Sequence, residues 1–170
     1  MALIVQNDSG TITNANSYID VAYADSYFTA RNNVTWSAAS TANKEAALVK
    51  AWQYIDTAFT FVGQIATDTQ NTEFPRLYIY NSAGKKLTGI DVKVKNAQCE
   101  YAVIALSQDL TINQTPSAQA PIKKEMNKAD VVETEVEYDT SKGQPIVYSY
   151  PLGDFWLKDF LGGNTFNGYY

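Results

Sequence analysis

The chain of 170 residues carries a net charge of −5, and 45% of its residues are hydrophobic and 13% aromatic. This composition is too apolar for an intrinsically disordered chain, and a domain of this length buries about 70% of the surface that its unfolded chain exposes. The absence of histidine removes the commonest general base and the commonest metal ligand of proteins.

The sequence shows no sign of export, membrane insertion or disulfide formation. No apolar run approaches the roughly 18 residues of a membrane span, and the start of the chain lacks the regions of a signal peptide. Cys99 is the single cysteine, which excludes an internal disulfide and a cysteine-based metal cluster. Because it lies in an apolar helical pattern, we expect a buried, inert thiol and an unexported protein with no membrane partner.

Two amphipathic helices are predicted in the first third of the chain. The first follows Asp20 or Ser17, either of which can cap the free N–H groups of a first helical turn. The second follows Ser40 or Thr41 and is expected to end near Gly63. Its apolar stripe comprises Leu48, Trp52, Ile55 and Phe59.

A connection and a third helix come next. Residues 77–90 begin with apolar alternation, reach a turn cluster that ends in Gly84 and continue with Lys85, Lys86 and Leu87, which predicts a short hairpin or loop. The third helix is expected from Val92 to Gln108. Its segment 101–106 is apolar on all sides, which indicates burial, so the three helices are expected to form the core.

The C-terminal part predicts a β-ribbon and a short helix. Residues 132–138 alternate strictly and place Glu133, Glu135 and Glu137 on one acidic face. Residues 122–130 are their expected antiparallel partner, which would bring lysines close to the glutamates. A helix of about eleven residues and an aromatic end follow, with large apolar side chains at Leu152, Phe155, Trp156, Phe160, Leu161, Phe166, Tyr169 and Tyr170.

Those aromatic residues leave two interpretations open. Either the terminal helix closes the chain's own core or it docks on another subunit or a partner, because large apolar side chains gain roughly 1.5 to 3 kcal/mol each from burial. The predicted fold class is therefore mainly α, a small helical bundle with a C-terminal β-ribbon and a terminal helix or arm. The expected division is a helical core over residues 1–115 and a ribbon, helix and arm over residues 116–170.

The residues give little support to catalysis. Asp20, Asp25 and Asp56 fit helix caps or polar faces, and the glutamate row lacks the looped geometry of a calcium site. The chain contains neither a phosphate-binding glycine loop nor a nucleophile elbow. We therefore predict no catalytic residue, no metal site, no cofactor and no enzymatic activity.

Nucleic-acid binding has arguments on both sides. The paired lysines at 85–86, 93–95 and 123–124 form candidate basic patches, and the 12 tyrosines offer rings on which unpaired bases stack. The opposing interpretation is that the lysines keep turns and helix ends soluble while most tyrosines fill half-buried positions. The net negative charge favours the second interpretation, because binding to phosphates normally needs a basic field.

The first half of the chain resembles a specific family of tailed-phage proteins. Its members share an Ala-Asn-Ser-Tyr opening and a Gln followed by Trp-Pro-Arg, and here Phe74 replaces the usual tryptophan. The resemblance extends over roughly residues 1 to 161. The matching positions are Ala15, Asn16, Ser17, Tyr18, Ala24, Asp25, Tyr27, Trp36, Ala46, Ala47, Leu48, Tyr54, Ile55, Asp56, Gly63, Gln70, Pro75 and Arg76.

Two functions are attached to that family. It is often labelled as DnaT-like single-stranded-DNA-binding protein, and it also resembles the head-to-tail adaptor, or connector, of long-tailed phages. The adaptor interpretation implies a virion neck protein that assembles as a twelvefold ring, contacts the portal and a tail-side neck or terminator protein, and lets DNA pass as cargo. Because the chain is acidic, the sequence favours the adaptor and leaves single-stranded-DNA binding as the alternative.

The motif at residues 70–76 is expected to be structural. Pro75 fixes the backbone of the connection, and Phe74 is expected to fill an apolar seam beside it. Arg76 is expected to bridge to a carboxylate such as Asp56, either within the subunit or across a ring.

Overall fold

The computed structural model describes residues 2–81, 84–110, 122–128, 133–138 and 150–162. By their contacts the residues form two compact units. The first unit comprises residues 1–110 and 150–170, and the second comprises residues 111–149. Each unit is described by itself.

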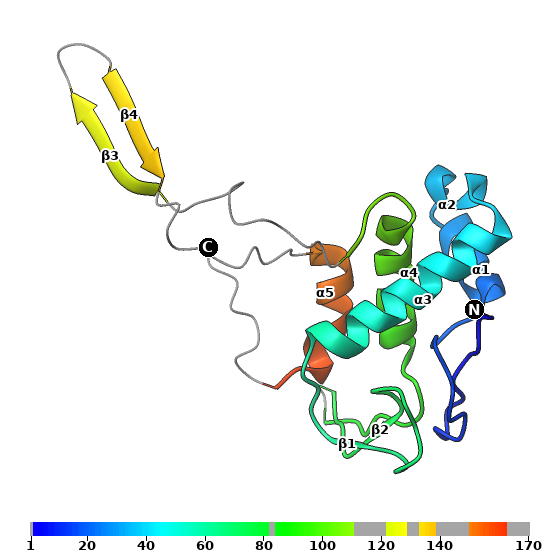
Figure 1. Ribbon diagram of the computed structural model, residues 1–170. Helices are drawn as coiled ribbons and strands as arrows, with labels where there is room; N and C mark the ends of the chain where they lie inside the picture. Colours follow the sequence, from blue (N-terminus) through cyan, green and yellow to red (C-terminus); the bar gives the residue numbers. More distant parts are fainter. Residues whose placement is uncertain (1, 82–83, 111–121, 129–132, 139–149, 163–170) are drawn as a thin grey trace. The chain divides into compact units, whose positions relative to one another are not determined.

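The first unit is helical (Figure 1). Its longer helices are α1 (Val21–Thr29), α3 (Thr41–Ala58) and α4 (Val92–Ala105). The shorter elements are α2 (Val34–Ala38), α5 (Pro151–Leu157) with the 3-10 turn Lys158–Phe160, and the two-residue strands β1 (Gln64–Ile65) and β2 (Arg76–Leu77). The prediction of a mainly α chain is confirmed, with five helices and one two-stranded antiparallel hairpin beside the minimal β1–β2 pair in the described part.

Side-chain caps fix where the main helices begin. The carboxylate of Asp20 accepts a hydrogen bond from the N–H of Tyr23, and the hydroxyl of Ser40 accepts one from the N–H of Asn43. Both caps agree with the sequence prediction. The short helix α2, which the sequence did not predict, is capped in the same way by Asn33. Caps of this kind contribute about 1 kcal/mol each.

The expected end of the second helix at Gly63 is wrong. Helix α3 ends at Ala58, because Phe59 is already extended. Gly63 lies in the following loop with a φ of +79°, and a Cβ there would lie 2.3 Å from the carbonyl oxygen of Leu77. Only glycine fits this left-handed position beside β2, so its role is close backbone approach instead of helix termination.

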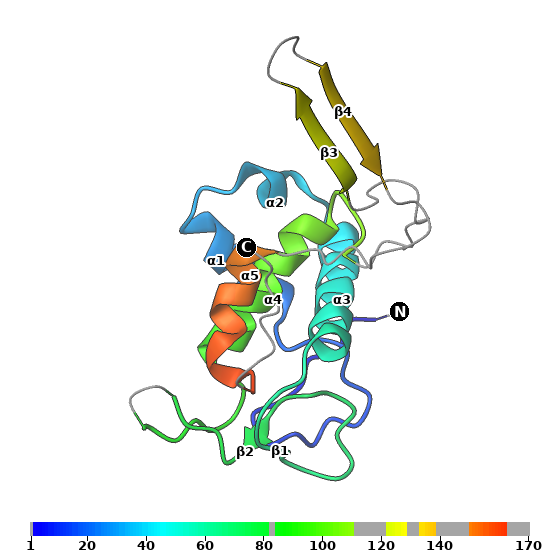
Figure 2. The ribbon, with the colours of Figure 1, turned by 90° about the vertical axis from the view of Figure 1, so that its left-hand side faces the viewer.

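Helix α4 lies at the centre of the core and packs against both α3 and α5 (Figure 2). Cys99 and Tyr101 are completely buried there, as the sequence predicted for this segment, and burial raises the pKa of the Cys99 thiol. The hydroxyl of Tyr101 donates to the carboxylate of Asp154 over 2.6 Å. A Cβ on Gly153 would lie 2.5 Å from the ring of Tyr101, so this glycine lets α5 approach α4 closely.

The terminal helix thus belongs to the core of the first unit. Phe160 is buried, and its ring contacts that of Phe74. Trp156 and Leu161 are half-buried, while Phe155 is exposed with the ammonium of Lys158 over its ring. A partner contact at Phe155 stays a prediction. Phe166, Tyr169 and Tyr170 lie outside the described residues.

The second unit contains the predicted ribbon. Strand β3 (Ile122–Lys128) pairs with β4 (Glu133–Tyr138) in antiparallel register. The register places Lys124 opposite Glu137 and Lys128 opposite Glu133, as the predicted pairing of lysines with glutamates requires. Glu135 lies opposite Met126. An acidic face formed by the three glutamates stays a prediction.

Candidate nucleic-acid interface

The segment 70–76 forms a loop that is held together by hydrogen bonds between polar side chains and the backbone. The side-chain oxygen of Gln70 accepts hydrogen bonds from the N–H groups of Ala66 and Thr67, and its amide nitrogen donates to the carbonyls of Thr72 and Pro75. Gln70 is only 9% exposed. The Gln70 side chain therefore links residues 66–67 to residues 72 and 75. All of its polar atoms have partners, as is usual for a buried amide.

Arg76 holds the same loop against the end of α3. Its guanidinium donates to the carbonyl oxygens of Phe61, Val62 and Gly63, over 3.1, 2.8 and 3.0 Å. It also forms an ion pair with the carboxylate of Glu73, where the sequence suggested Asp56. The role of Arg76 inside one subunit is thus structural.

Asp56 connects the segment 70–76 to helix α3. Its carboxylate accepts hydrogen bonds from the hydroxyl of Tyr18 and from the N–H of Glu73. The hydroxyl of Tyr18 in turn accepts from the N–H of Phe74. Burial raises the pKa of Asp56 to about 7, although these hydrogen bonds act in the opposite direction.

The raised pKa of Asp56 predicts a pH-dependent stability. Between the unfolded value of 3.8 and about 7, the folded protein holds a proton that the unfolded chain has lost. The stabilisation is complete below the unfolded pKa and is lost as the pH rises towards 7. We expect Asp56→Asn to flatten this dependence, which amounts to at most about 1.4 kcal/mol per pH unit.

Urea unfolding midpoints of both proteins between pH 4 and 8 measure this effect. The control is Asp109→Asn, because Asp109 is an exposed carboxylate paired with Lys50. The control is expected to retain the slope of the unchanged protein. An equal slope for Asp56→Asn would show that Asp56 does not carry the proton.

The segment 70–76 leads directly into two short paired stretches, residues 77–81 and 84–87, here together named the Tyr–Lys loop. Tyr80 pairs with Lys86 across an antiparallel bridge, and the N–H of Leu87 donates to the carbonyl of Ile79 over 2.9 Å. Ile79 is buried, whereas its neighbours Tyr78 and Tyr80 are 62% and 55% exposed. The buried isoleucine thus anchors a loop that presents two tyrosine rings to solvent.

The backbone of Tyr78 is strained. Its φ is +61°, in the left-handed region that bulky residues adopt only rarely. Strain of this kind costs of order 1 to 3 kcal/mol and concentrates at functional sites. An exposed tyrosine has no packing role that would explain this conformation, so Tyr78 is a candidate for function.

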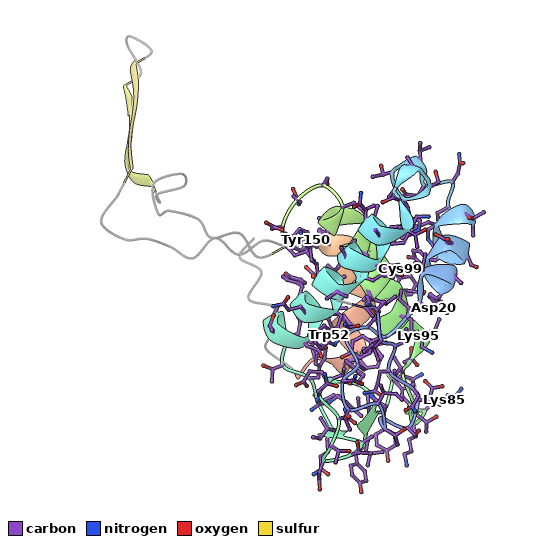
Figure 3. All side chains as sticks on the ribbon, turned by 45° about the vertical axis from the view of Figure 1, so that its right-hand side comes forward. Asp20, Trp52, Lys85, Lys95, Cys99 and Tyr150 are labelled. Atoms are coloured by element: carbon purple, nitrogen blue, oxygen red, sulfur yellow. The ribbon has the colours of Figure 1, made fainter. Side chains whose placement is uncertain are left out.

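The lysines of the Tyr–Lys loop differ from four of the five other described lysines of the first unit; the fifth, Lys158, lies with its ammonium over the ring of Phe155. Lys85 and Lys86 are exposed, and within the described residues neither forms an ion pair. Figure 3 shows Lys85 at the outer edge of the first unit. Four other lysines of this unit are paired with carboxylates. These pairs are Lys44–Asp25, Lys50–Asp109, Lys93–Asp159 and Lys95–Asp8. The candidate patch at 93–95 is therefore neutralised, while that at 85–86 is not.

Most positions of the family motif are buried and structural. Ser17 accepts a hydrogen bond from the side chain of Gln98, and the indole of Trp36 donates to Asp25 over 2.7 Å. The motif residues that are at least nine-tenths buried are Ala15, Asn16, Ser17, Tyr18, Ala24, Tyr27, Trp36, Ala47, Leu48, Tyr54, Ile55, Gln70, Phe74 and Pro75. Tyr78 and Tyr80 are not among the site residues that the sequence predicts, although the lysine pair 85–86 near them is a candidate basic patch.

A comparison with protein families assigns the chain. A family model described as "Putative DnaT-like ssDNA binding protein" matches residues 1–169. The chain belongs to this family. No curated protein and no solved structure matches it.

The interpretation as a head-to-tail adaptor is wrong. The DnaT-like family is described by single-stranded-DNA binding, which supports the alternative that the sequence left open. The twelvefold ring, the portal and tail-side partners, DNA as passing cargo and the virion neck location depended on the adaptor interpretation and fall with it. The error has a physical cause. The net charge of the chain does not distinguish lysines that are paired with carboxylates from lysines that are not.

The prediction that the chain is not an enzyme is confirmed by the family, which is one of DNA-binding proteins. In the part of the chain that the structure describes, no cluster of three or more carboxylates and thiols could hold a metal ion. No helix among those residues is both long enough and apolar enough to cross a membrane.

Proposed function

We propose that the protein binds single-stranded DNA and that the Tyr–Lys loop makes the contact. The family supports the first part of the proposal. The bridge between Tyr80 and Lys86, which brings an exposed ring and an unpaired lysine to adjacent positions, carries the second. Proteins that bind single strands without sequence preference combine aromatic rings, on which bases stack, with cations that contact phosphates.

The arrangement favours single strands over duplex. Bases in a duplex are stacked on one another and offer no free faces, whereas each unpaired base can stack on a tyrosine and gain about 1 to 3 kcal/mol. Two exposed rings suit a contact of about two successive bases. The net charge of −5 opposes long-range attraction of DNA, so we expect weak, salt-sensitive binding in which stacking supplies most of the free energy.

Direct binding tests the proposal. Fluorescence anisotropy with a labelled oligonucleotide of mixed sequence, at about 50 mM salt, measures the Kd of the full chain. The same oligonucleotide annealed to its complement is the control. Tighter binding of the single strand supports the proposal, and no binding of either form would refute it.

The lysines predict a change in salt dependence. For single strands the slope of log K against log salt changes by about 0.7 for each phosphate contact. We expect Lys85→Ala/Lys86→Ala to reduce the magnitude of the slope by about 1.4 if both ammonium groups contact phosphates. The measurement is the anisotropy titration at several salt concentrations.

A charge-matched variant controls for the change in net charge. Lys50→Ala/Lys95→Ala removes the same two charges from lysines that are paired with carboxylates. Its slope is expected to stay close to that of the unchanged protein. Equal slopes for the two double variants would locate the phosphate contact elsewhere.

A further inference from the structure

Gly63 lies against the two residues that flank Tyr78. It directly precedes β1, which pairs with β2, and Figures 1 and 2 show these two strands side by side at one end of the first unit. A Cβ at Gly63 would lie 2.3 Å from the carbonyl oxygen of Leu77 and 2.9 Å from Cγ1 of Ile79. The chain on both sides of Tyr78 therefore closes onto a position that has room for glycine alone.

Leu77 and Ile79 are each fixed by further contacts. Leu77 pairs with Gln64 in the antiparallel register of β1 and β2. Ile79 is buried, and its carbonyl oxygen accepts a hydrogen bond from the N–H of Leu87 over 2.9 Å. Because only Tyr78 lies between these two fixed residues, its backbone has few conformations that can join them.

These contacts account for the left-handed backbone of Tyr78. A bulky residue keeps a φ of +61° only where the surrounding structure over-determines its conformation. In this conformation the side chain of Tyr78 is exposed, although the next residue, Ile79, is buried. The backbone that carries the ring is thus set before a ligand arrives, which lowers the cost of ordering the loop on binding.

We propose that Gly63 is a positioning residue of the DNA contact, which holds Tyr78 in the left-handed conformation that presents its ring to an unpaired base. The inference rests on the proposed function, because it gives Gly63 a part in the contact that the Tyr–Lys loop makes. Gly63 acts through Tyr78 and does not touch the base itself. A side chain at position 63 would push residues 77 and 79 away and release Tyr78 from this conformation.

Gly63→Ala tests the inference in two backgrounds. In the otherwise unchanged chain it is expected to weaken the binding of a single-stranded oligonucleotide about fivefold or more, because stacking on one ring is lost. In the Tyr78→Ala background it is expected to change the Kd by less than about twofold, because the ring that Gly63 positions is already absent. Fluorescence anisotropy of the four full-length proteins at one salt concentration measures the Kd values, and urea unfolding shows that each protein is folded.

Gly89→Ala is the matched control for strain at a glycine. Gly89 also has a positive φ, +68°, and a Cβ there would lie 2.9 Å from Cβ of Asp8. Neither residue belongs to the Tyr–Lys loop. The control is therefore expected to lose stability but to bind the oligonucleotide with an unchanged Kd.

Ile79→Val keeps the inference testable if Gly63→Ala does not fold. It shortens the side chain that lies against Gly63 and removes only one methyl group from the core, a change that folded proteins usually tolerate. We expect a smaller loss of affinity than for Gly63→Ala, and no loss in the Tyr78→Ala background.

The outcomes separate this inference from the proposed function. If the unchanged protein binds the oligonucleotide, an unchanged Kd for Gly63→Ala or an equal loss in both backgrounds would overturn the role of Gly63, and the proposed function would stand. The same two results for Ile79→Val would overturn it where Gly63→Ala does not fold. If the unchanged protein binds no oligonucleotide, the proposed function fails and the role of Gly63 fails with it.

Discussion

Tyr78→Ala/Tyr80→Ala is expected to weaken the binding of single-stranded DNA by at least about 30-fold. Both rings are exposed, and Tyr80 pairs across a bridge with Lys86, which forms no ion pair within the described residues. Loss of stacking on two rings corresponds to about 2 to 6 kcal/mol, of which the lower limit is the 30-fold change. Anisotropy titrations of the two proteins at one salt concentration measure the ratio of their Kd values.

Two controls separate stacking from other effects. Tyr78→Phe/Tyr80→Phe keeps both rings and is expected to retain most of the affinity, because stacking uses the ring face and not the hydroxyl. Phe155→Ala removes an aromatic ring of similar exposure, 58%, from α5, far along the chain from the Tyr–Lys loop. A loss of affinity in both controls that equals the loss in the alanine variant would contradict a stacking site in this loop.

Much of the fold could be predicted because its signals are local. Asp20 and Ser40 cap their helices through bonds to residues three positions away, which a sequence displays directly. Alternation in β4 likewise predicts a strand within a few residues. Helix α2 escaped prediction because five residues are too few to show a helical period.

The candidate site depends on tertiary pairing, which the sequence does not display. Lys93 and Lys85 look alike in the sequence, but Lys93 is paired with Asp159, 66 positions away. Only the folded chain shows that Lys85 and Lys86 lack such carboxylates among the described residues. A net charge of −5 was therefore a poor guide to the potential at one loop.

The role of Arg76 was predictable in kind but not in detail. The sequence indicated a structural ion pair, and the structure supplies Glu73 as the partner. The guanidinium also donates hydrogen bonds to three consecutive carbonyls, those of residues 61 to 63. The sequence could not show this, because it depends on the path of the loop after α3. The arginine of the family motif therefore acts chiefly on the backbone.

Arg76→Ala is accordingly expected to destabilise the fold by about 3 to 5 kcal/mol. The Arg76 side chain is only 9% exposed, and its loss leaves backbone carbonyls without their donors. Arg76→Lys is expected to be nearly as damaging, because an ammonium cannot reproduce the planar fork of donors. Urea unfolding at neutral pH measures both free energies.

Lys50→Ala is the matched control for loss of a cation. Lys50 pairs with Asp109 at the surface, where both side chains are at least half exposed, and such pairs contribute about 0 to 1 kcal/mol. A small effect here and a large one at Arg76 would assign the stabilisation to the hydrogen bonds that Arg76 donates to the loop. If Arg76→Ala costs no more than Lys50→Ala, these bonds do not hold the loop.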